Sequence, residues 1–237
     1  MNDTLNLLIV GHGRMGRRIE ELAPGAGFAV AGCLDEHSNA GGRGLAPGTW
    51  AGVDVAIDVS AGGAVLDNVR ALAALGIDVV IGTTGWSADE ADVRSAAAGA
   101  GIGVVAAPTF ALGAVVLEEL AWRASKMLAP YGDVGAWIHE AHHAAKRDAP
   151  SGTALRIRSA MTHAGWPSGI DTTSTRAGSI PGTHTIGFDA PHESLTLTHA
   201  ARDRAVFAHG ALVAARWLAG RPGWFTMRDV LGLEEHS

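Results

Sequence analysis

A glycine-rich turn near the N-terminus constrains the fold of this chain more than any other part of its sequence. The apolar run Leu5–Val10 predicts a short buried strand, and residues 14–22 have the composition of a helix. Between them lies the pattern G-x-G-x-x-G, formed by Gly11, Gly13 and Gly16. In such a unit the first glycine permits a tight turn, the second lets backbone N–H groups approach a pyrophosphate, and the third allows close helix packing. The segment predicts dinucleotide binding, with an ordinary glycine-rich turn as the alternative.

An acidic residue follows at the distance that dinucleotide binding requires. Asp35 ends the next apolar run, about 20 residues beyond Gly16, where a carboxylate accepts hydrogen bonds from the adenosine ribose hydroxyls. Glu36 comes next, at a point where a 2′-phosphate would need Arg or Lys, and two carboxylates would repel that phosphate. Arg14 offsets part of this repulsion. We therefore expect NADH to be preferred, with NADPH as a second, less favoured cofactor.

Short apolar runs alternate with helix-like segments through the first 110 residues. After the glycine turn we expect a helix at 64–75 and strands at 28–34, 53–59, 78–81 and 103–106. The runs are continuously apolar, which is typical of strands buried on both faces. Strands that alternate with helices in this way form a doubly wound parallel sheet covered by helices.

The pattern changes in the middle of the chain. Apolar side chains recur at helical spacing over residues 112–126, and residues 134–139 predict a strand. Residues 183–208 alternate between apolar and polar, as strands with one exposed face do. This part of the chain therefore predicts a mixed sheet in a second domain.

The last segments return to a helical pattern. Residues 211–218 and 224–233 are helix-like, and we expect them to pack on the first domain. The sequence thus predicts an α/β protein. A Rossmann-type doubly wound parallel sheet is expected in residues 1–110 and 205–237, and a second α+β domain with a mixed sheet in residues 111–204.

Two turns follow predicted strands of the first domain. Gly82, Thr83 and Thr84 come after the run 78–81, and residues 107–110 come after the run 103–106. Ligands of a doubly wound sheet lie beyond the carboxyl ends of its strands, so both turns are placed to line the nicotinamide end of the cleft. They are equally consistent with ordinary strand-to-helix loops, and spacing leaves both interpretations open.

Composition restricts the partners of the chain. Its 18 Lys and Arg residues against 24 Asp and Glu give a net charge of −6, whereas a nucleic-acid or anionic membrane surface would need a basic footprint. Cys33 is the single cysteine, which excludes an internal disulfide and fits a reducing, cytoplasmic compartment. The apolar run at the N-terminus is too short for a signal peptide, and Pro108 interrupts the longest uncharged stretch, so we expect no membrane span. Small metabolites remain as the expected binding partners of the chain.

The densest group of titratable side chains lies between residues 139 and 153. His139, Glu140 and His143 match the zinc-protease pattern H-E-x-x-H, which needs both imidazoles on one face of a helix. The preceding residues predict a strand instead, and a strand would separate the two histidines by about 13 Å, too far to share a zinc ion. We therefore expect no metal here.

A second interpretation of this cluster uses more of its residues. His142, His143 and Lys146 supply acid/base and anion-binding groups. The turn Ser151-Gly152-Thr153 then begins a predicted helix at 154–161, and a helix N-terminus with free N–H groups binds carboxylates. The alternative for this turn is a simple helix cap. A cap leaves the histidines and the lysine upstream unexplained.

Taken together, these motifs resemble one known family, 4-hydroxy-tetrahydrodipicolinate reductase (dihydrodipicolinate reductase) of bacterial lysine and diaminopimelate synthesis. The similar segments extend over nearly the whole chain, and EAHHxxKxDAPSGTA is the most specific of them. They are GHGRMG, VVIGTTGW, APTFALG, EAHHAAKRDAPSGTAL, RAGSIPGTH, LTHAARDRAVFAHGA and FTMRDVLGL.

The resemblance implies NAD(P)H-dependent reduction of 4-hydroxy-2,3,4,5-tetrahydrodipicolinate to tetrahydrodipicolinate with loss of water, by a homotetramer. It implies that His142 is the acid/base and that Lys146 donates a proton. His143 and the turn at Ser151, Gly152 and Thr153 would bind the small dicarboxylate substrate. Together with Gly13 and Gly16, the cofactor positions that it implies are Gly11, Arg14, Met15, Asp35, Gly82, Thr83, Thr84, Ala107, Pro108, Thr109 and Phe110.

The chain departs from the family at three places, one of which is the stretch around residues 36–55, where it has fewer residues than expected. Ala144 and Ala145 stand where bulky or polar residues are frequent, and residues 59–61 lack an Arg that helps to hold a 2′-phosphate, in agreement with an NADH preference. Two other functions stay open: a different two-domain NAD-dependent amino-acid dehydrogenase, such as an aspartate dehydrogenase, and a non-catalytic NADH-binding sensor. In a sensor that has lost catalysis, we expect substitutions at His142, Lys146 or the Ser-Gly-Thr turn. All of these residues are present.

Overall fold

The computed structural model describes residues 4–167 and 169–233. The chain divides into two compact units, and the first is discontinuous in sequence. It runs to Ala111 and resumes at Phe207, whereas Leu112–Val206 forms the second unit. Each unit has its own sheet and its own core, and each is described by itself.

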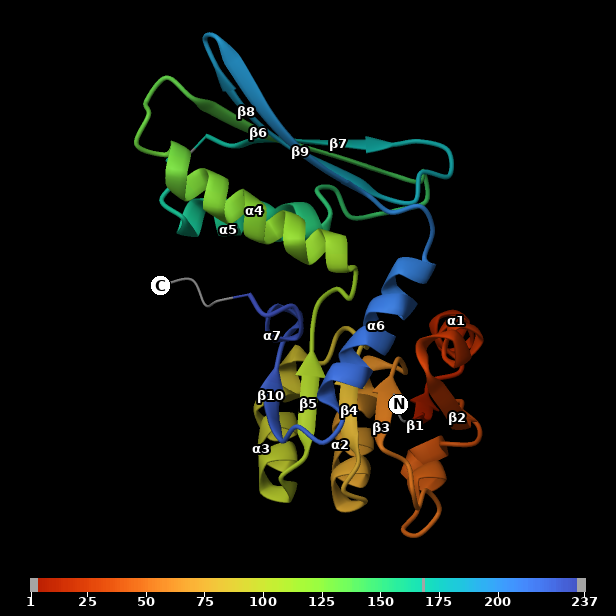
Figure 1. Cartoon of the computed structure of the whole chain (residues 1–237). Helices are drawn as coiled ribbons and strands as arrows, with labels where there is room; N and C mark the ends of the chain where they lie inside the picture. The colour runs from red at the N-terminus through yellow and green to blue at the C-terminus, as the bar shows by residue number, and fades with distance from the viewer. Residues whose placement is uncertain (1–3, 168, 234–237) are drawn as a thin grey trace. The chain divides into compact units, whose positions relative to one another are not determined.

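The first unit is built on a six-stranded sheet in which every strand is parallel to its neighbours (Figure 1). The strand order is β10-β5-β4-β3-β1-β2. The strands are β1 (Leu5–Val10), β2 (Phe28–Leu34), β3 (Val55–Asp58), β4 (Asp78–Ile81), β5 (Gly103–Ala106) and β10 (Gly223–Phe225). The central strands are buried on both faces, as their largely apolar sequences predict.

Helices cover both faces of this sheet. Right-handed crossovers place the helix between β1 and β2 on one face and the helices between β3, β4 and β5 on the other. The helices are α1 (Arg14–Leu22), α2 (Val65–Ala74), α3 (Glu90–Ala100) and α7 (Met227–Val230), with most of α6 (Ala205–Leu218). Short 3₁₀ turns occupy Pro24–Ala26, Ala40–Leu45, Gly62–Ala64 and Ser87–Asp89. Strand β2 is added on one side of β1, whereas β3, β4 and β5 are added in succession on the other side. Doubly wound folds bind ligands at this point between β1 and β3, where the strand order reverses.

The second unit has a four-stranded mixed sheet in the order β7-β6-β8-β9. Strand β6 is parallel to β7 and antiparallel to β8, and β8 is antiparallel to β9. Its elements are α4 (Leu112–Leu128), β6 (Gly135–His142), α5 (Gly152–His163), β7 (Asp171–Arg176), β8 (Thr183–Ala190) and β9 (Glu193–Ala200). Helices α4 and α5 pack together and cover one face, where Ile138, Ile157 and Phe188 form part of the core (Figure 1). The structure confirms the predicted fold class.

The alternation along β6 decides which side chains lie under the helices. Ile138, Glu140 and His142 are buried on the covered face, whereas Trp137 and His139 lie on the open face. The register continues this division across the sheet, because Glu140 pairs with His184 and His184 pairs with His199. A row of titratable side chains therefore crosses the covered face of the sheet.

Two expectations from the sequence are wrong. Residues 224–233 do not form one helix, because Trp224 and Phe225 pair with β5 and Thr226 then caps the short helix α7. The alternating stretch 183–208 does not continue as strand to its end. Strand β9 ends at Ala200, and the Asp203 carboxylate accepts a hydrogen bond from the N–H of Ala205, where α6 begins.

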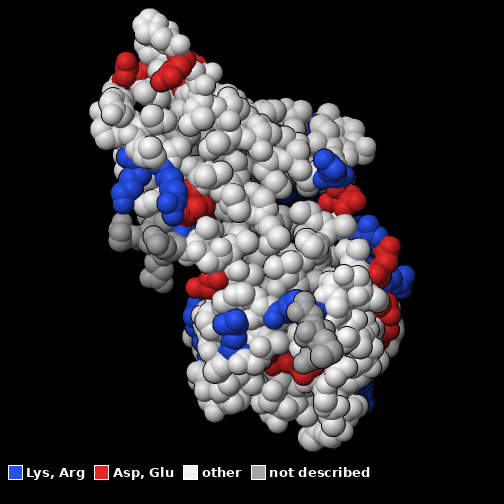
Figure 2. All heavy atoms as spheres, viewed as in Figure 1, with Lys and Arg blue, Asp and Glu red and all other residues white. Residues whose placement is uncertain are grey.

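Charged side chains of both signs lie beside each other on the face shown in Figure 2. In the part of the chain that the structure describes, no helix has the length and apolar character needed to cross a membrane.

Candidate active site

The glycine turn after β1 has the geometry of a phosphate-binding loop. Gly11 has a φ of +102°, and a Cβ there would lie 2.5 Å from the backbone of Val59. A Cβ at Gly16 would lie 2.1 Å from the Gly11 carbonyl oxygen, so only glycine allows this contact between turn and helix. Among the described residues, no heavy atom lies within 4 Å of a Cβ built on Gly13, and no side chain caps α1. The first N–H groups of α1 therefore have no capping side chain, which leaves them available to an anion such as a pyrophosphate.

Asp35 lies directly after β2, next to this turn. The N–H of Gly11 donates to the carbonyl of Leu34 over 2.7 Å, which joins the turn to the end of β2. One carboxylate oxygen of Asp35 accepts from the N–H of Ser38 (2.8 Å), the hydroxyl of Ser38 (2.8 Å) and the N–H of His37 (3.0 Å). Hydrogen bonds from the backbone and then the side chain of Ser38 lower the pKa of Asp35 to about 2. The carboxylate is thus ionised and oriented, with its second oxygen available for a ribose.

The turn after β4 is held by a buried carboxylate. The Thr83 hydroxyl donates to Oδ1 of Asp58 over 2.8 Å, and the same carboxylate accepts from Ser60 and Asn68. Gly82 packs against Val59, since a Cβ there would lie 3.0 Å from its side chain. These contacts fix the turn at the carboxyl edge of the sheet.

A cavity of about 370 Å³ lies beside this turn in the first unit. Four of the predicted cofactor positions line it, namely Thr83, Thr84, Ala107 and Pro108. Its remaining wall is formed by Gly85, Trp86, Ser87, Glu90, Arg94, Ala106, Trp224 and Thr226, and none of the glycine-turn residues takes part. Phe110 is buried, with Gly210 of α6 against its carbonyl group. Thr109 accepts a hydrogen bond from the N–H of Ala111.

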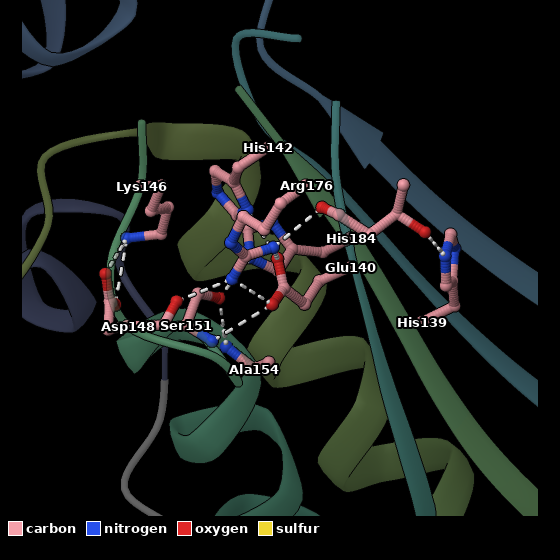
Figure 3. A network of polar contacts seen from close by, with 10 residues as sticks. His139, Glu140, His142, Lys146, Asp148, Ser151, Ala154, Arg176 and His184 are labelled. Carbon is pink, nitrogen blue, oxygen red and sulfur yellow. Dashed lines mark hydrogen bonds and ion pairs between the residues drawn. The ribbon is translucent and has the colours of Figure 1, made fainter. Parts of the chain in front are cut away.

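A buried ion pair organises the covered face of the second unit. Glu140 has no exposed surface, and both of its oxygens accept from the guanidinium of Arg176, over 2.6 and 2.9 Å (Figure 3). Arg176 also donates to the backbone carbonyl of Asp148. Burial by itself would raise the pKa of Glu140, but hydrogen bonds from Arg176, Ser174 and His142 lower it to about 2. Glu140 is therefore ionised at neutral pH.

His142 lies at the end of β6 and contacts this carboxylate. Its Nδ1 is hydrogen-bonded to Oε2 of Glu140, and its ring meets the ring of His184 edge-on at 5.1 Å. Burial lowers the pKa of His142, and it outweighs the opposing effect of Glu140; Lys146 and Arg176 lower the pKa further. The ring is thus mainly neutral at pH 7.

Lys146 and the turn before α5 lie close to this histidine in sequence and provide cationic and N–H groups. The Lys146 ammonium donates to both oxygens of Asp148, over 2.7 and 2.9 Å, and this hydrogen bond lowers the pKa of Asp148 (Figure 3). Asp148 is exposed, so displacing it from Lys146 costs little. His143 is half-buried in the same loop, and Ala144 and Ala145 are exposed.

Ser151 is the N-cap of α5. Its Oγ accepts from the N–H of Ala154 over 3.2 Å and lies 2.9 Å from Nε2 of His184, while its own N–H donates to Oε1 of Glu140 over 3.2 Å. Gly152 and Thr153 form the first turn of the helix, with Gly152 exposed. The serine is thus a cap, as one interpretation of the sequence holds, and it still leaves N–H groups at the helix start for an anion.

The zinc-protease arrangement is not formed. His139 lies on the open face of the sheet, with Nε2 3.0 Å from the Thr175 hydroxyl, whereas His143 follows the end of β6. Donor atoms of Glu140, His142 and His184 do lie within 4.8 Å of one another. Arg176 donates to both Glu140 oxygens, and a cation there would have to displace this guanidinium. The three residues fit a hydrogen-bonded network better than a metal site.

Sequence reasoning missed three residues of this network. Glu140 begins the segment EAHHAAKRDAPSGTAL, and Arg176 and His184 are the two ends of RAGSIPGTH, but the sequence predicts no role in the site for any of them. The alternation of β6 provides a signal for Glu140, which shares a face with His142. No local signal connects His142 with Arg176 or His184, because only the pairing of β6 with β7 and β8 brings these residues together.

Comparisons with known proteins agree on one family. The models "Dihydrodipicolinate reductase, N-terminus" and "Dihydrodipicolinate reductase, C-terminus" match residues 5–110 and 113–231. The 4-hydroxy-tetrahydrodipicolinate reductases of Anaeromyxobacter sp. (strain Fw109-5) and Laribacter hongkongensis (strain HLHK9) are 37% and 38% identical to the chain, with 97% of the chain and 98% of each relative covered.

A solved structure agrees in fold. The dipicolinate-bound dihydrodipicolinate reductase from Paenisporosarcina sp. TG-14 superposes with a TM-score of 0.76 at 21% identity, covering 94% of this chain and 97% of the other. Family membership and the Rossmann-type first unit support binding of a pyridine nucleotide. The chain therefore belongs to the dihydrodipicolinate reductase family, and it is an oxidoreductase of lysine and diaminopimelate biosynthesis.

Proposed function

We propose that this chain catalyses the NAD(P)H-dependent reduction of 4-hydroxy-2,3,4,5-tetrahydrodipicolinate to tetrahydrodipicolinate, with loss of water. The observation that carries the proposal is the buried His142 network, which lies next in sequence to Lys146 and to the free N–H groups of α5. Residues 1–110 and 205–237 bind the cofactor, and residues 111–204 bind the substrate and form the oligomer.

The first unit holds the cofactor through backbone groups and a few side chains. The N–H groups at the start of α1, from Arg14 and Met15, bind the pyrophosphate in the space that Gly13 leaves open. Asp35 binds the adenosine ribose, and the turns at 82–84 and 107–110 flank the nicotinamide. When bound, the cofactor supplies a hydride.

Glu36 next to Asp35 supports a preference for NADH. It is exposed, and no basic side chain stands in the residues 59–61 after β3. A 2′-phosphate would therefore meet two carboxylates. We expect kcat/KM to be higher with NADH than with NADPH, and Glu36→Arg should move the ratio towards NADPH. Steady-state kinetics with both cofactors measures this ratio, and a clearly higher kcat/KM for NADPH in the unchanged protein contradicts the assignment.

The second unit supplies the groups that a small dicarboxylate needs. Lys146 and the N–H groups of Gly152 and Thr153 neutralise the two carboxylates, and His143 completes the substrate site. Ser151, predicted as a substrate contact, is buried and shapes the site as the cap of α5. A substrate carboxylate takes the place of the exposed Asp148 carboxylate on Lys146.

The proton chemistry falls to His142 and Lys146. After the 4-hydroxyl group leaves as water, hydride addition at C4 of the conjugated imine leaves negative charge on the substrate. A proton from His142 or Lys146 quenches this charge, and a positioned donor of this kind contributes about 10²- to 10⁴-fold in rate. Solvent can then reprotonate His142, because this side chain retains a small exposed surface.

The open face of the second sheet supports assembly as a homotetramer. Trp137 is 37% exposed there, and its ring covers Gly187, where a Cβ would lie 2.2 Å from the indole. A sheet that carries an exposed tryptophan on one face is suited to pack against another copy. We place the protein in the cytoplasm, where the single thiol of Cys33 stays reduced.

One assay tests the proposed function. NADH oxidation is followed at 340 nm with freshly generated 4-hydroxy-tetrahydrodipicolinate, and we expect turnover that depends on this substrate. Binding of NADH without turnover would favour a sensor, and turnover with an amino acid and NAD would favour an aspartate dehydrogenase.

A further inference from the structure

We propose that Glu140 is a positioning residue, whose carboxylate holds the ring of His142 and the start of α5 in one fixed arrangement. The inference rests on the proposed function, in which His142 is an acid/base group. Glu140 does not touch substrate in this proposal. It acts by presenting His142 in one orientation and one tautomer.

The contacts of Glu140 join three separate segments of the second unit. Oε2 accepts hydrogen bonds from Nδ1 of His142 and from Arg176 at the end of β7. Oε1 accepts hydrogen bonds from Arg176 and from the N–H of Ser151 before α5. A carboxylate has about four lone-pair positions, and these partners, together with the Ser174 side chain, leave none of them free. Glu140 is therefore a fixed anchor, with no acceptor left for a substrate or a metal ion.

The direction of these hydrogen bonds determines the state of His142. An ionised carboxylate can only accept, so Nδ1 of His142 carries a hydrogen in both the neutral and the charged ring. The proton that His142 gains or loses is then on Nε2. This atom lies next to Gly182, where a Cβ would approach it to 3.1 Å, so the absence of a side chain keeps Nε2 uncovered on that side.

The ionisation of the network follows from the charges around His142. The groups that face it are Glu140 on β6, Arg176 on β7, His184 on β8 and Lys146 in the loop after β6. Burial, Lys146 and Arg176 lower the pKa of His142, whereas Glu140 raises it. Arg176 keeps Glu140 ionised, so Glu140 does not take the proton from His142 over the working pH range.

The decisive variant is Glu140→Gln, which keeps the size of the side chain and removes its charge. We expect the pKa of His142, measured by NMR titration of its ring, to fall in the folded variant, since only the groups that lower it remain. We expect kcat to fall by about 10- to 100-fold, with KM for NADH within about 2-fold of the unchanged protein, because part of the effect of the donor is lost. The high-pH limb of the kcat profile should move to lower pH.

A matched control separates positioning from the loss of any ion pair. Glu118 on α4 pairs with Arg156 on α5 over 3.3 Å, in the same unit but without contact to His142. Glu118→Gln should leave the pKa of His142 and the pH profile unchanged. Glu140→Asp restores the negative charge and should recover part of kcat and of the pKa. An unchanged pKa of His142 in Glu140→Gln, or an equal shift in Glu118→Gln, overturns the proposal.

A measurement on the unchanged protein decides the case even if Glu140→Gln does not fold. The ¹⁵N chemical shifts of the neutral His142 ring report its tautomer, and we expect hydrogen on Nδ1 and none on Nε2. The opposite tautomer rules out the positioning role. Both NMR readouts are independent of turnover. An inactive wild-type enzyme would therefore refute the proposed function, and the pKa and tautomer of the His142 ring would still decide whether Glu140 positions it.

Discussion

At the scale of single residues, the second unit combines groups that carry charge with groups that keep space open. Lys146 is held by the exposed Asp148, so its ammonium can exchange one carboxylate for another. Gly182, with a φ of +143°, leaves room next to the ring of His142. The site thus depends on a missing side chain as much as on those that are present.

Lys146→Ala should collapse kcat while NADH affinity stays nearly intact. The variant loses a proton donor and an anion-binding charge, so we expect kcat to fall by about 10²- to 10⁴-fold. Turnover with substrate and fluorescence titration with NADH measure the two quantities. The control is Lys126→Ala, which changes the only other lysine of the chain and should keep full turnover. A fully active Lys146→Ala enzyme refutes the assignment.

Gly182→Ala should reduce both stability and turnover. Its backbone conformation is unfavourable for any side chain, which costs on the order of 1–3 kcal/mol, and the new methyl group presses on Nε2 of His142. Gly178→Ala is the matched control, because Gly178 also has a positive φ but no described atom within 4 Å of its Cβ position. We expect both variants to lose stability in urea unfolding, and only Gly182→Ala to lose kcat beyond the loss of folded protein. Equal kcat in the two variants would show that the contact is unimportant.

At the scale of secondary structure elements, the sequence predicts those with strong local patterns and misses the others. The buried strands of the first unit are largely apolar runs with a single polar residue near one end, and the sequence locates them. Strand β7 reads DTTSTR and has no apolar residue, so no hydrophobic pattern predicts it, and it is defined by its pairing with β6. Helix α3 is rich in alanine and has little contrast between its faces. His142, Lys146 and Ser151 were found because they are close in sequence, whereas Arg176 and His184 reach the site through strand pairing.

The row of histidines on β8 and β9 should make the second unit sensitive to acid. Burial and the neighbouring His142 lower the pKa of His184 to about 4. The unfolded chain therefore binds a proton near pH 6.5 that the folded chain takes up only near pH 4, and stability present above pH 6.5 is lost as the pH falls through this range. Urea unfolding followed by tryptophan fluorescence at pH 7 and pH 4.5 should show this loss. In His184→Gln the loss between the two pH values should be smaller, and an identical loss would contradict the assigned cause.

At the scale of the whole molecule, the open face of the second sheet is the surface whose role in assembly is easiest to test. Trp137→Lys places a charge in the middle of this face, and burial of an unpaired charge between two copies is costly. We expect light scattering to show a smaller assembly for this variant than for the unchanged protein. The exposed Met127→Lys, on α4, is the control. An unchanged mass for Trp137→Lys would exclude this face from the oligomer interface.

The discontinuity of the first unit has a consequence for biosynthesis. Its edge strand β10 and the helix segment that covers Phe110 both come from the part of the chain after residue 206. On the ribosome, every residue of the inserted unit emerges before the sheet that precedes it has its last strand. Until then the edge of β5 is unpaired, and an open parallel edge can recruit other nascent chains. While residues 112–222 are being synthesised, this edge of the sheet is therefore open to pairing with other chains.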